Sequence, residues 1–367
     1  MKFSLAHIKK TYRFLKIYSL TRTITKIVAR LRLKFPLWIF LFFPRYFRRG
    51  KTVGLIGCGH HTFSSLAFYL STSTNFKIIW AYDINKKASD LLKYAYKIKT
   101  INNKLEYFKN PDIVYIASNH SSHTQYAINY IKKGCDVYVE KPISINLEQF
   151  KQLCKVVESS NSNFYVGYNR PHSAAIKLLS SYTEKNTPFT LNCYVIGHVL
   201  EKNHWYRKKS EGSRIVSNLG HWIDLFVHIN YWSNKFHSFI DIKISYSDIE
   251  TPSENISISI ITPRKDLISI VFSTRNEPYE GVTETINFQC GNINAKIDDF
   301  RKIEIWKNDI YISKKYYPKD NGHKLASKQP NFDKIRNWDE IKTSTKVMLY
   351  IEEMVQNKKE TGRLFFN

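Results

Sequence analysis

A strand followed by a glycine-rich turn and a helix is the feature that most restricts how this sequence can fold. The β-branched run 52–56 leads into Gly57-Cys58-Gly59, and an apolar, helix-compatible stretch follows at 63–70. The first glycine permits a tight turn, and the second lets a diphosphate approach the N–H groups at the helix start. Thr62 stands where a third glycine is usual, so this pattern needs support from the rest of the sequence.

A second strand, 78–82, ends on Asp83. A carboxylate at this place accepts hydrogen bonds from the ribose hydroxyls of NAD and repels the 2′-phosphate of NADP. Lys86 and Lys87 follow and weaken that discrimination, so the sequence favours NAD, with NADP as the alternative cofactor. The competing interpretation of Asp83 is a simple turn or helix cap.

Two further apolar runs predict strands that are buried on both faces of a parallel sheet, at 113–117 and 137–139. The first opens into Ser118 and Asn119, and the second into Glu140-Lys141-Pro142. Ligands of such sheets bind beyond the carboxyl ends of the strands. The sequence therefore predicts that these polar residues lie at a ligand site.

Lys141 is the candidate acid/base. Hydride transfer from a carbinol leaves a hydroxyl proton to be removed, and a lysine whose pKa is lowered by desolvation and neighbouring cations can take it. Glu140 would orient the lysine or contact the nicotinamide ribose. The alternative is a surface lysine in a turn before Pro142.

A second candidate constellation is His221 with Asp224, three residues apart on a predicted helix, where the carboxylate could fix the tautomer of the histidine. Taken alone, His221 fits a core histidine with a satisfied ring better than a catalytic residue. His120 and His123 form a His-x-x-His pair, but a metal site needs more ligands, so we expect no metal.

The ordered motifs resemble those of the Gfo/Idh/MocA oxidoreductases. They are Gly57-Cys58-Gly59, the strand that opens at Asn119 and His123, Glu140-Lys141-Pro142, the run 167–170, and His221-x-x-Asp224. The resemblance covers residues 51–350 and implies a Rossmann domain, then an α/β domain with a large open sheet that often makes oligomer contacts. It also implies NAD(P)-dependent chemistry on sugars, with Lys141 and His221 as the catalytic residues.

From the motifs and this resemblance we predict two sets of binding residues. The cofactor set is Gly57, Gly59, His60, Asp83, Ser118, Asn119, His123, Glu140 and Lys141. The substrate set is Asn169, Arg170, Trp205, Tyr206, Arg214 and Asn218, in which aromatic rings would stack on a sugar or base and arginines would bind phosphate or carboxylate.

One departure from the family bears on the substrate. Many members carry an aspartate four residues before the histidine, whereas this chain has Ser217. The stretch 214–218 looks more like members linked to bacterial surface-polysaccharide synthesis, which favours a nucleotide-linked or otherwise anionic sugar. A non-catalytic sugar or nucleotide sensor, or a membrane-recruited scaffold that keeps the fold, is the alternative function.

The second half of the chain predicts a mainly antiparallel open sheet. Apolar and polar residues alternate along 240–247 and 256–260, and a turn at 263–266 leads into another strand. A helix from about 337 to 355 closes the domain. We predict an α/β protein with a basic extension (1–50), a Rossmann domain (51–165) and a substrate and oligomerisation domain (166–367).

The extension is strongly basic. Residues 1–51 hold 14 Lys or Arg and no Asp or Glu, more than half of the net charge of +25. Apolar residues recur at helical spacing among these cations: Ile17, Leu20, Ile24, Ile27 and Leu31. With the aromatic run 37–43, this pattern predicts contact with an anionic membrane surface or, alternatively, an arm packed on its own protein or on a partner subunit. Nucleic-acid binding is disfavoured because no other segment resembles a base reader.

The five cysteines are scattered, without a Cys-x-x-Cys pair, which argues against a zinc site or disulfide framework and fits a reducing cytosol. The longest apolar run, 36–43, is far shorter than the roughly 20 residues that a spanning helix needs. We therefore expect a cytoplasmic protein, with peripheral contact at the inner membrane surface through residues 1–50 as a possibility.

Overall fold

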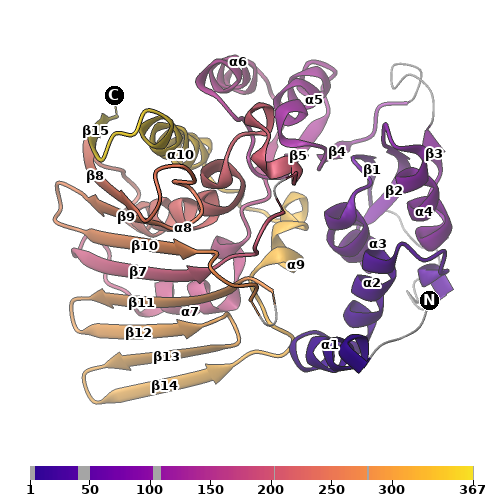
Figure 1. Cartoon of the computed structure of the whole chain (residues 1–367). Helices are drawn as coiled ribbons and strands as arrows, with labels where there is room; N and C mark the ends of the chain where they lie inside the picture. The colour runs from indigo at the N-terminus through magenta and orange to yellow at the C-terminus, as the bar shows by residue number, and fades with distance from the viewer. Residues whose placement is uncertain (1–4, 40–49, 102–108, 202, 279–280, 367) are drawn as a thin grey trace. The chain divides into compact units, whose positions relative to one another are not determined.

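A computed structural model describes residues 5–39, 50–101, 109–201, 203–278 and 281–366, which form two compact units (Figure 1). The first unit is residues 1–168 with 323–338, and the second is residues 169–322 with 339–367. After forming part of the second unit, the chain returns to the first unit at residues 323–338. The prediction of a single boundary at 165/166 does not include this return. Gln329 Nε2 donates to the Val166 carbonyl oxygen (2.8 Å) and Tyr115 Oη to that of Ser327 (2.8 Å), which fastens the returning segment.

The first unit is built on a parallel six-stranded sheet in the order β3-β2-β1-β4-β5-β6. Its strands are β1 (Lys51–Ile56), β2 (Phe76–Tyr82), β3 (Thr100–Ile101), β4 (Ile113–Ile116), β5 (Asp136–Val139) and β6 (Phe164–Val166). The continuously apolar runs predicted to be buried, β4 and most of β5, are buried along their length. The Rossmann fold predicted from the sequence is confirmed.

Helices connect and cover these strands. They are α1 (Leu5–Ile17), α2 (Leu20–Leu31), the short η1 (Leu37–Ile39), the π-helical η3 (Thr62–Leu66) continued by α3 (Ala67–Ser71), α4 (Lys86–Tyr96), α5 (His120–Lys132), α6 (Leu147–Glu158), α9 (His323–Ala326) and η10 (Gln329–Asn331). Figure 1 shows α2 beside α3.

The basic extension packs on its own protein. Val28 of α2 and Leu37 of η1 are 4% and 2% exposed, within the same core cluster as Phe63 and Leu92. Ile24 packs against that cluster as well, so part of the predicted apolar face meets the Rossmann unit. Leu20 is exposed, and residues 40–43 of the aromatic run lie outside the described residues.

The second unit contains a nine-stranded sheet in the order β14-β13-β12-β11-β7-β10-β9-β8-β15, antiparallel except for the parallel pair β7 and β10. Its strands are β7 (Phe189–Ile196), β8 (Phe239–Tyr246), β9 (Ile256–Ile261), β10 (Leu267–Ser273), β11 (Thr283–Cys290), β12 (Ile293–Asp298), β13 (Lys302–Lys307), β14 (Ile310–Lys315) and β15 (Thr361–Phe365). The predicted open, mainly antiparallel sheet is confirmed.

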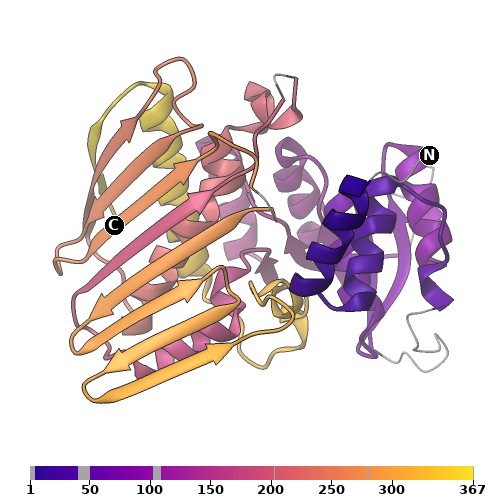
Figure 2. The same ribbon diagram turned by 60° about the horizontal axis from the view of Figure 1, so that its bottom comes forward.

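Helices pack on one face of this sheet, and Figure 2 shows its other face free of them. They include α7 (Ala174–Tyr182), the π-helical η8 (Ile215–Leu219) with α8 (Gly220–Asn230), and α10 (Trp338–Gln356). Short helical turns are η5 (Arg170–His172), η6 (Trp205–Arg207), η7 (Lys209–Glu211) and η9 (Tyr231–Ser233). Side chains along β7, β9 and β10 alternate between buried and more exposed, as one covered face requires.

Candidate active site

The polar residues predicted at strand ends share one edge of the parallel sheet. The Gly57 amide after β1 donates to the Tyr82 carbonyl oxygen (2.9 Å), and the Glu140 amide after β5 donates to that of Ile116 (2.8 Å). These bonds align the carboxyl ends of β1, β2, β4 and β5. The turn at Gly57 and the lysine at 141 therefore belong to one ligand-facing edge.

The glycine turn fits a dinucleotide diphosphate. Gly57 has a φ of +86°, and a Cβ there would lie 2.4 Å from the Ala117 carbonyl oxygen, so only glycine suits this turn. A Cβ at Gly59 would meet no atom within 4 Å, which leaves room for a ligand beside the start of the helix. Thr62, in place of the third glycine, is buried, and its Oγ1 has no hydrogen-bond partner among the described residues.

Asp83 is held beside this turn. Its carboxylate accepts hydrogen bonds from the backbone amides of Cys58 (2.6 Å) and Asn85 (2.7 Å). Each carboxylate oxygen keeps a further lone pair for a ribose hydroxyl. Of the two roles weighed against ribose binding, the turn is present and the helix cap is not, because the N-cap of α4 is Asn85. The turn leaves the carboxylate with capacity for a ligand.

Glu140 sits in a network that the sequence does not reveal. It is 7% exposed and accepts hydrogen bonds from His61 Nε2 and Tyr138 Oη, both at 3.0 Å. Burial alone would raise the pKa of Glu140, but the His61 ring and its hydrogen bond, with the charges of His323 and Lys141, lower that pKa to about 2. The carboxylate is thus ionised at neutral pH beside Lys141.

His61 and His323 are additions to the predicted residue set. Their rings lie 5.5 Å apart between centroids, on the Glu140 side of the sheet edge. His61 follows the predicted contact His60 in the glycine turn, whereas His323 lies 182 residues beyond Lys141. His61 could have been found from its place in the glycine turn. No sequence pattern points to His323.

His123 was predicted to contact the cofactor, but its position is that of a buried residue. It is 1% exposed, and its Nδ1 and Nε2 lie 2.8 Å and 3.1 Å from the carbonyl oxygens of Pro142 and Ser118. The ring therefore ties the ends of β4 and β5 together behind the ligand-facing edge. We interpret His123 as a positioning residue for the segment that carries Lys141.

The other predicted cofactor residues are accessible. Lys141 and Ser118 are half-buried, while His60 and Asn119 are exposed. Asn119 precedes the first turn of α5, and Ser118 Oγ lies 2.7 Å from Ser122 Oγ in that turn. The Lys141–Pro142 peptide bond is cis.

In the second unit, the predicted histidine follows a π-helical segment. Residues 215–219 form η8, whose wide turn closes with the Gly220 amide bonded to the Ile215 carbonyl oxygen, and His221 comes directly after it. Such bulges are frequent at functional sites. His221 and Asn218 are half-buried, and Ser217 is buried with its hydroxyl bonded to the Ser213 carbonyl oxygen.

Asp224 is fully buried beneath this segment. Its Oδ1 accepts a hydrogen bond from Ser344 Oγ of α10 at 2.8 Å. This bond joins α8 to α10, so Asp224 has a structural role. The sequence predicted a different role, that of fixing the tautomer of His221. That role stays a prediction.

Arg170 is engaged inside the second unit. Its Nε and Nη2 donate to the two oxygens of Glu284 (2.8 Å each), and its guanidinium lies 4.2 Å from the Trp222 ring centre. Trp222 Nε1 donates to the same carboxylate. Asn169, also buried, donates from Nδ2 to the Asn321 carbonyl oxygen (2.5 Å). Because both charges of this pair are buried and matched, we interpret Arg170 as a structural residue and leave it out of the substrate set.

Arg214 is likewise paired. It is 2% exposed, donates to Glu254 Oε2 (2.7 Å) and to the His198 carbonyl oxygen (2.6 Å), and packs over the Phe272 ring. Burial is the largest cause of the shift in the pKa of Arg214 and lowers it, whereas the carboxylate of Glu254 opposes this shift. This arginine too is held by protein groups and is left out of the substrate set.

Trp205 and Tyr206 remain accessible. Trp205 is 38% exposed, and its ring lies edge-on to that of Tyr206 with centroids 4.3 Å apart. The His204 side chain caps the turn by accepting from the Tyr206 amide. The pair therefore presents an aromatic surface on a defined turn.

Comparison with known proteins identifies the first unit. Residues 51–168 match the model of a family described as "Oxidoreductase family, NAD-binding Rossmann fold". The Rossmann unit belongs to the Gfo/Idh/MocA oxidoreductase family. Among curated proteins, glucose-6-phosphate 3-dehydrogenase of Bacillus subtilis is 24% identical over 160 residues, 44% of this chain and 43% of that protein. The chain thus matches less than half the length of such curated relatives.

Solved structures of this family extend the likeness to the whole fold. GenD2 from gentamicin A biosynthesis, in complex with NAD, has a TM-score of 0.70 at 12% identity, covering 87% of this chain and 97% of that one. The WlbA dehydrogenase of Bordetella pertussis, in complex with NADH and UDP-GlcNAcA, has a TM-score of 0.69 at 14% identity, covering 87% and 99%. These likenesses show the fold of both units.

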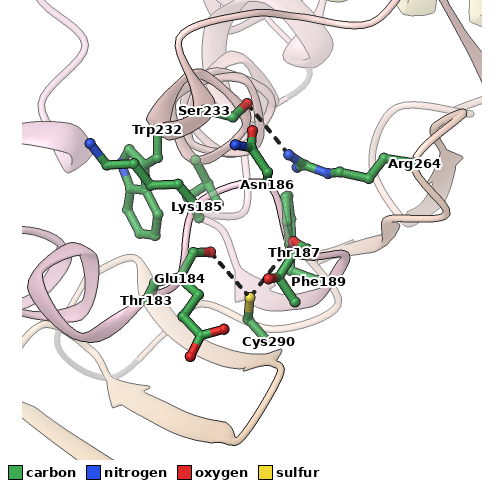
Figure 3. A pocket seen from close by; sticks show the side chains of 11 residues that line it. Thr183, Glu184, Lys185, Asn186, Thr187, Phe189, Trp232, Ser233, Arg264 and Cys290 are labelled. Carbon is green, nitrogen blue, oxygen red and sulfur yellow. Dashed lines mark hydrogen bonds between the residues drawn. The ribbon is translucent and has the colours of Figure 1, made fainter.

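One small pocket lies within the second unit. It encloses about 210 Å³, counting the part open to solvent, between residues 183–189, Trp232 and Arg264 (Figure 3). Arg264 is held by Asp266, and Cys290 Sγ contacts the carbonyl oxygens of Glu184 and Thr187. The guanidinium and the thiol of this pocket therefore already have protein partners.

The described residues contain neither a metal-binding cluster nor a helix that could span a membrane. No group of three or more His, Cys, Asp or Glu side chains among them is arranged to hold a metal ion. Within the same residues, no helix has both the length and the apolar character required to cross a membrane.

Proposed function

We propose that this protein is an NAD-dependent oxidoreductase that interconverts a carbinol and a keto carbon of a sugar. The observation that carries the proposal is Lys141, placed after the ionised Glu140 on the same sheet edge as the Gly57–Gly59 turn. When bound, the nicotinamide ring accepts or supplies the hydride. The residues of the chain have to bind the cofactor and move the remaining proton.

Lys141 is the proposed acid/base. In the oxidative direction its neutral amine takes the substrate hydroxyl proton while the C–H hydride leaves, and in the reductive direction its ammonium returns that proton to the forming alkoxide. The adjacent Glu140 carboxylate holds a negative charge beside the ammonium and orients it. His123 fixes the backbone on which both residues stand.

We propose NAD as the preferred cofactor because Asp83 presents a carboxylate next to the glycine turn. A 2′-phosphate there would face this carboxylate and be repelled, whereas two ribose hydroxyls would donate to it. The exposed Lys86 and Lys87 lower the discrimination without removing it.

The proposed substrate is a nucleotide-linked or otherwise anionic sugar of surface-glycan synthesis. The WlbA structure, with its UDP-sugar, supports this class. In this chain the accessible candidates for substrate contact are Trp205, Tyr206 and Asn218, with His221 as the assisting residue. Stacking on an exposed aromatic pair suits a sugar or a base.

The uncovered face of the nine-stranded sheet is the proposed contact with a second copy of the chain. It carries apolar residues among its polar ones, including Tyr194, Ile261 and Trp306, which are 47%, 43% and 40% exposed.

We also propose peripheral membrane contact, now confined to the end of the extension, where Leu33, Trp38 and Ile39 are exposed next to Lys34. The apolar face of α2 is not part of it because Val28 is buried.

The test combines cofactor binding with turnover. NADH binding is measured by energy transfer from tryptophan, and turnover by nicotinamide absorbance with a panel of UDP-, GDP-, CMP- and dTDP-sugars. We expect Lys141→Ala to lower turnover by about 100- to 10,000-fold and to leave NADH binding unchanged. Full activity of this variant would remove Lys141 from the chemistry. NADH binding without turnover on any sugar would instead favour the sensor function.

A further inference from the structure

Helix α2 lies against the helix that follows the glycine turn. Arg22 Nη2 donates to Ser65 Oγ at 2.8 Å, and the guanidinium carbon lies 5.2 Å and 4.7 Å from the ring centres of Phe68 and Tyr69. These partners belong to η3 and α3, whose first turn faces the dinucleotide site. The extension is therefore fastened to the helix on which a diphosphate would rest.

Arg22 is a buried cation without a counter-charge. It is 5% exposed, and neither Nε nor Nη1 has a hydrogen-bond partner among the described residues. The chain has no acidic residue before Asp83, and within the described residues no carboxylate pairs with Arg22. Removing a charge from water is unfavourable unless an opposite charge lies nearby. An anionic ligand beside η3 would supply that charge.

Two further cations follow Arg22 at intervals of four residues, Lys26 and Arg30, so the three share one side of α2. Their field reaches the glycine turn. Desolvation by the surrounding protein is the largest cause that lowers the pKa of His60 to about 4, and the charges of Lys26, His61, Arg30 and Arg22 lower it further. His60 directly follows Gly59. Among the three cations, Lys26 acts most strongly on His60 and Arg22 least, while Arg22 is the one that contacts Ser65 farther along the helix.

We propose that helix α2 is an added wall of the dinucleotide site, in which Arg22, Lys26 and Arg30 attract the cofactor diphosphate electrostatically. This inference rests on the proposed cofactor binding and extends it, because the family match begins at residue 51 and α2 lies outside it. A cation near the diphosphate strengthens the binding of any dinucleotide, since the charge it meets is common to all of them.

The geometry distinguishes this role from membrane or nucleic-acid binding by α2. A helix that binds such surfaces presents its cations to solvent, whereas Arg22 is buried against the rings of Phe68 and Tyr69 and Lys26 is half-buried. Arg30 is the exposed member of the row. The two cations that are turned towards the protein favour a ligand of the dinucleotide site over an extended anionic surface. The occupant of the site is therefore a small anion-bearing molecule.

The experiment measures dissociation constants of NADH, ADP-ribose and adenosine for the full chain and for the variant Lys26→Gln/Arg30→Gln. We expect NADH and ADP-ribose to bind the variant about 3- to 10-fold more weakly at low ionic strength, and the difference to shrink as salt shortens the Debye length. Adenosine, which lacks phosphate, should bind both proteins equally. Lys9→Gln/Lys16→Gln on α1 is the matched control, with the same loss of charge at exposed positions.

A second readout needs no cofactor. Titration of the His60 ring by NMR should give a higher pKa in the Lys26→Gln/Arg30→Gln variant than in the control, because two cations that disfavour its protonation are gone. If the wild-type chain binds NADH and the variant binds it equally well, the role of α2 is overturned while the proposed function stands. If the wild-type chain binds neither NADH nor ADP-ribose, the proposed function itself is overturned.

Discussion

His61 Nε2 lies 3.0 Å from Glu140 Oε1, which joins the turn after β1 to the end of β5 across 79 residues of sequence. The pair connects the segment that would hold the diphosphate with the segment that carries Lys141. Tyr138 donates a second hydrogen bond to the same oxygen from within β5. The acid/base segment and the cofactor turn are therefore positioned by one buried carboxylate.

The first prediction concerns the pH dependence of stability. The folded-state pKa of Glu140 is about 2, below its ordinary value of 4.5, so its contribution to stability is present above pH 4.5 and is lost as pH falls towards 2. Between about pH 5.5 and 3.5 we expect it to remove about 1 kcal/mol from the free energy of unfolding, measured by urea denaturation. In Glu140→Gln this part of the pH dependence should be missing. An identical pH dependence in the two proteins would contradict the ionised state.

The second prediction compares two glycines of one turn. Gly57→Ala should lower the free energy of unfolding by about 1–3 kcal/mol, because its Cβ would lie 2.4 Å from the Ala117 carbonyl oxygen at a positive φ. Gly59→Ala should leave stability unchanged, since its Cβ meets no protein atom within 4 Å, and should weaken NADH binding. Thermal unfolding and NADH titration separate the two effects. Undiminished NADH affinity in Gly59→Ala would place the diphosphate elsewhere.

The third prediction concerns cofactor choice. Asp83→Asn keeps the size of the side chain and removes the charge that a 2′-phosphate would meet. We expect the ratio of NADPH to NADH affinity to rise by about 10-fold or more. Asp90→Asn, on the neighbouring helix α4, is the matched control and should leave the ratio unchanged. The same small change in both variants would remove Asp83 from the ribose site.

The residues at the sheet edge could be predicted from the sequence because the patterns that mark them are local. A glycine turn between a strand and a helix, and apolar runs that end in polar residues, follow from backbone geometry and burial over a few positions. Gly57, Asp83 and Lys141 could therefore be placed on one edge before any coordinates. The alternation of apolar and polar residues likewise predicted the second sheet.

Residues whose partners are distant in sequence could not be assigned in this way. Arg170 and Arg214 look like anion ligands until Glu284 and Glu254 come into contact with them, 114 and 40 residues away. The amphipathic pattern of α2 is compatible with a membrane and with a protein surface, since both accept an apolar face. The buried Val28, the packing of Ile24 on the same core and the bond from Arg22 to Ser65 show which surface α2 meets.

The fourth prediction tests the structural role of Arg170. Arg170→Met leaves the Glu284 carboxylate buried without its bidentate partner, and we expect a loss of about 3–5 kcal/mol in the free energy of unfolding. Glu284→Gln in the same background removes the unpaired charge and should restore part of that loss. If Arg170→Met folds with unchanged stability and only weakens substrate binding, Arg170 belongs in the substrate set after all.

The last prediction separates the two roles considered for the extension. Deleting residues 1–39 would remove Val28 and Leu37 from the Rossmann core and should cost on the order of 3–6 kcal/mol, so loss of membrane binding by such a truncation would be ambiguous. Trp38→Ser/Ile39→Ser changes side chains that are 44% and 49% exposed and should leave thermal stability nearly unchanged. If this end of the extension contacts membranes, the double variant should sediment less with anionic vesicles, while Tyr94→Ser, equally exposed on α4, should sediment like the wild type. Equal sedimentation of all three proteins would leave the extension with a single role, that of α2 on the Rossmann unit.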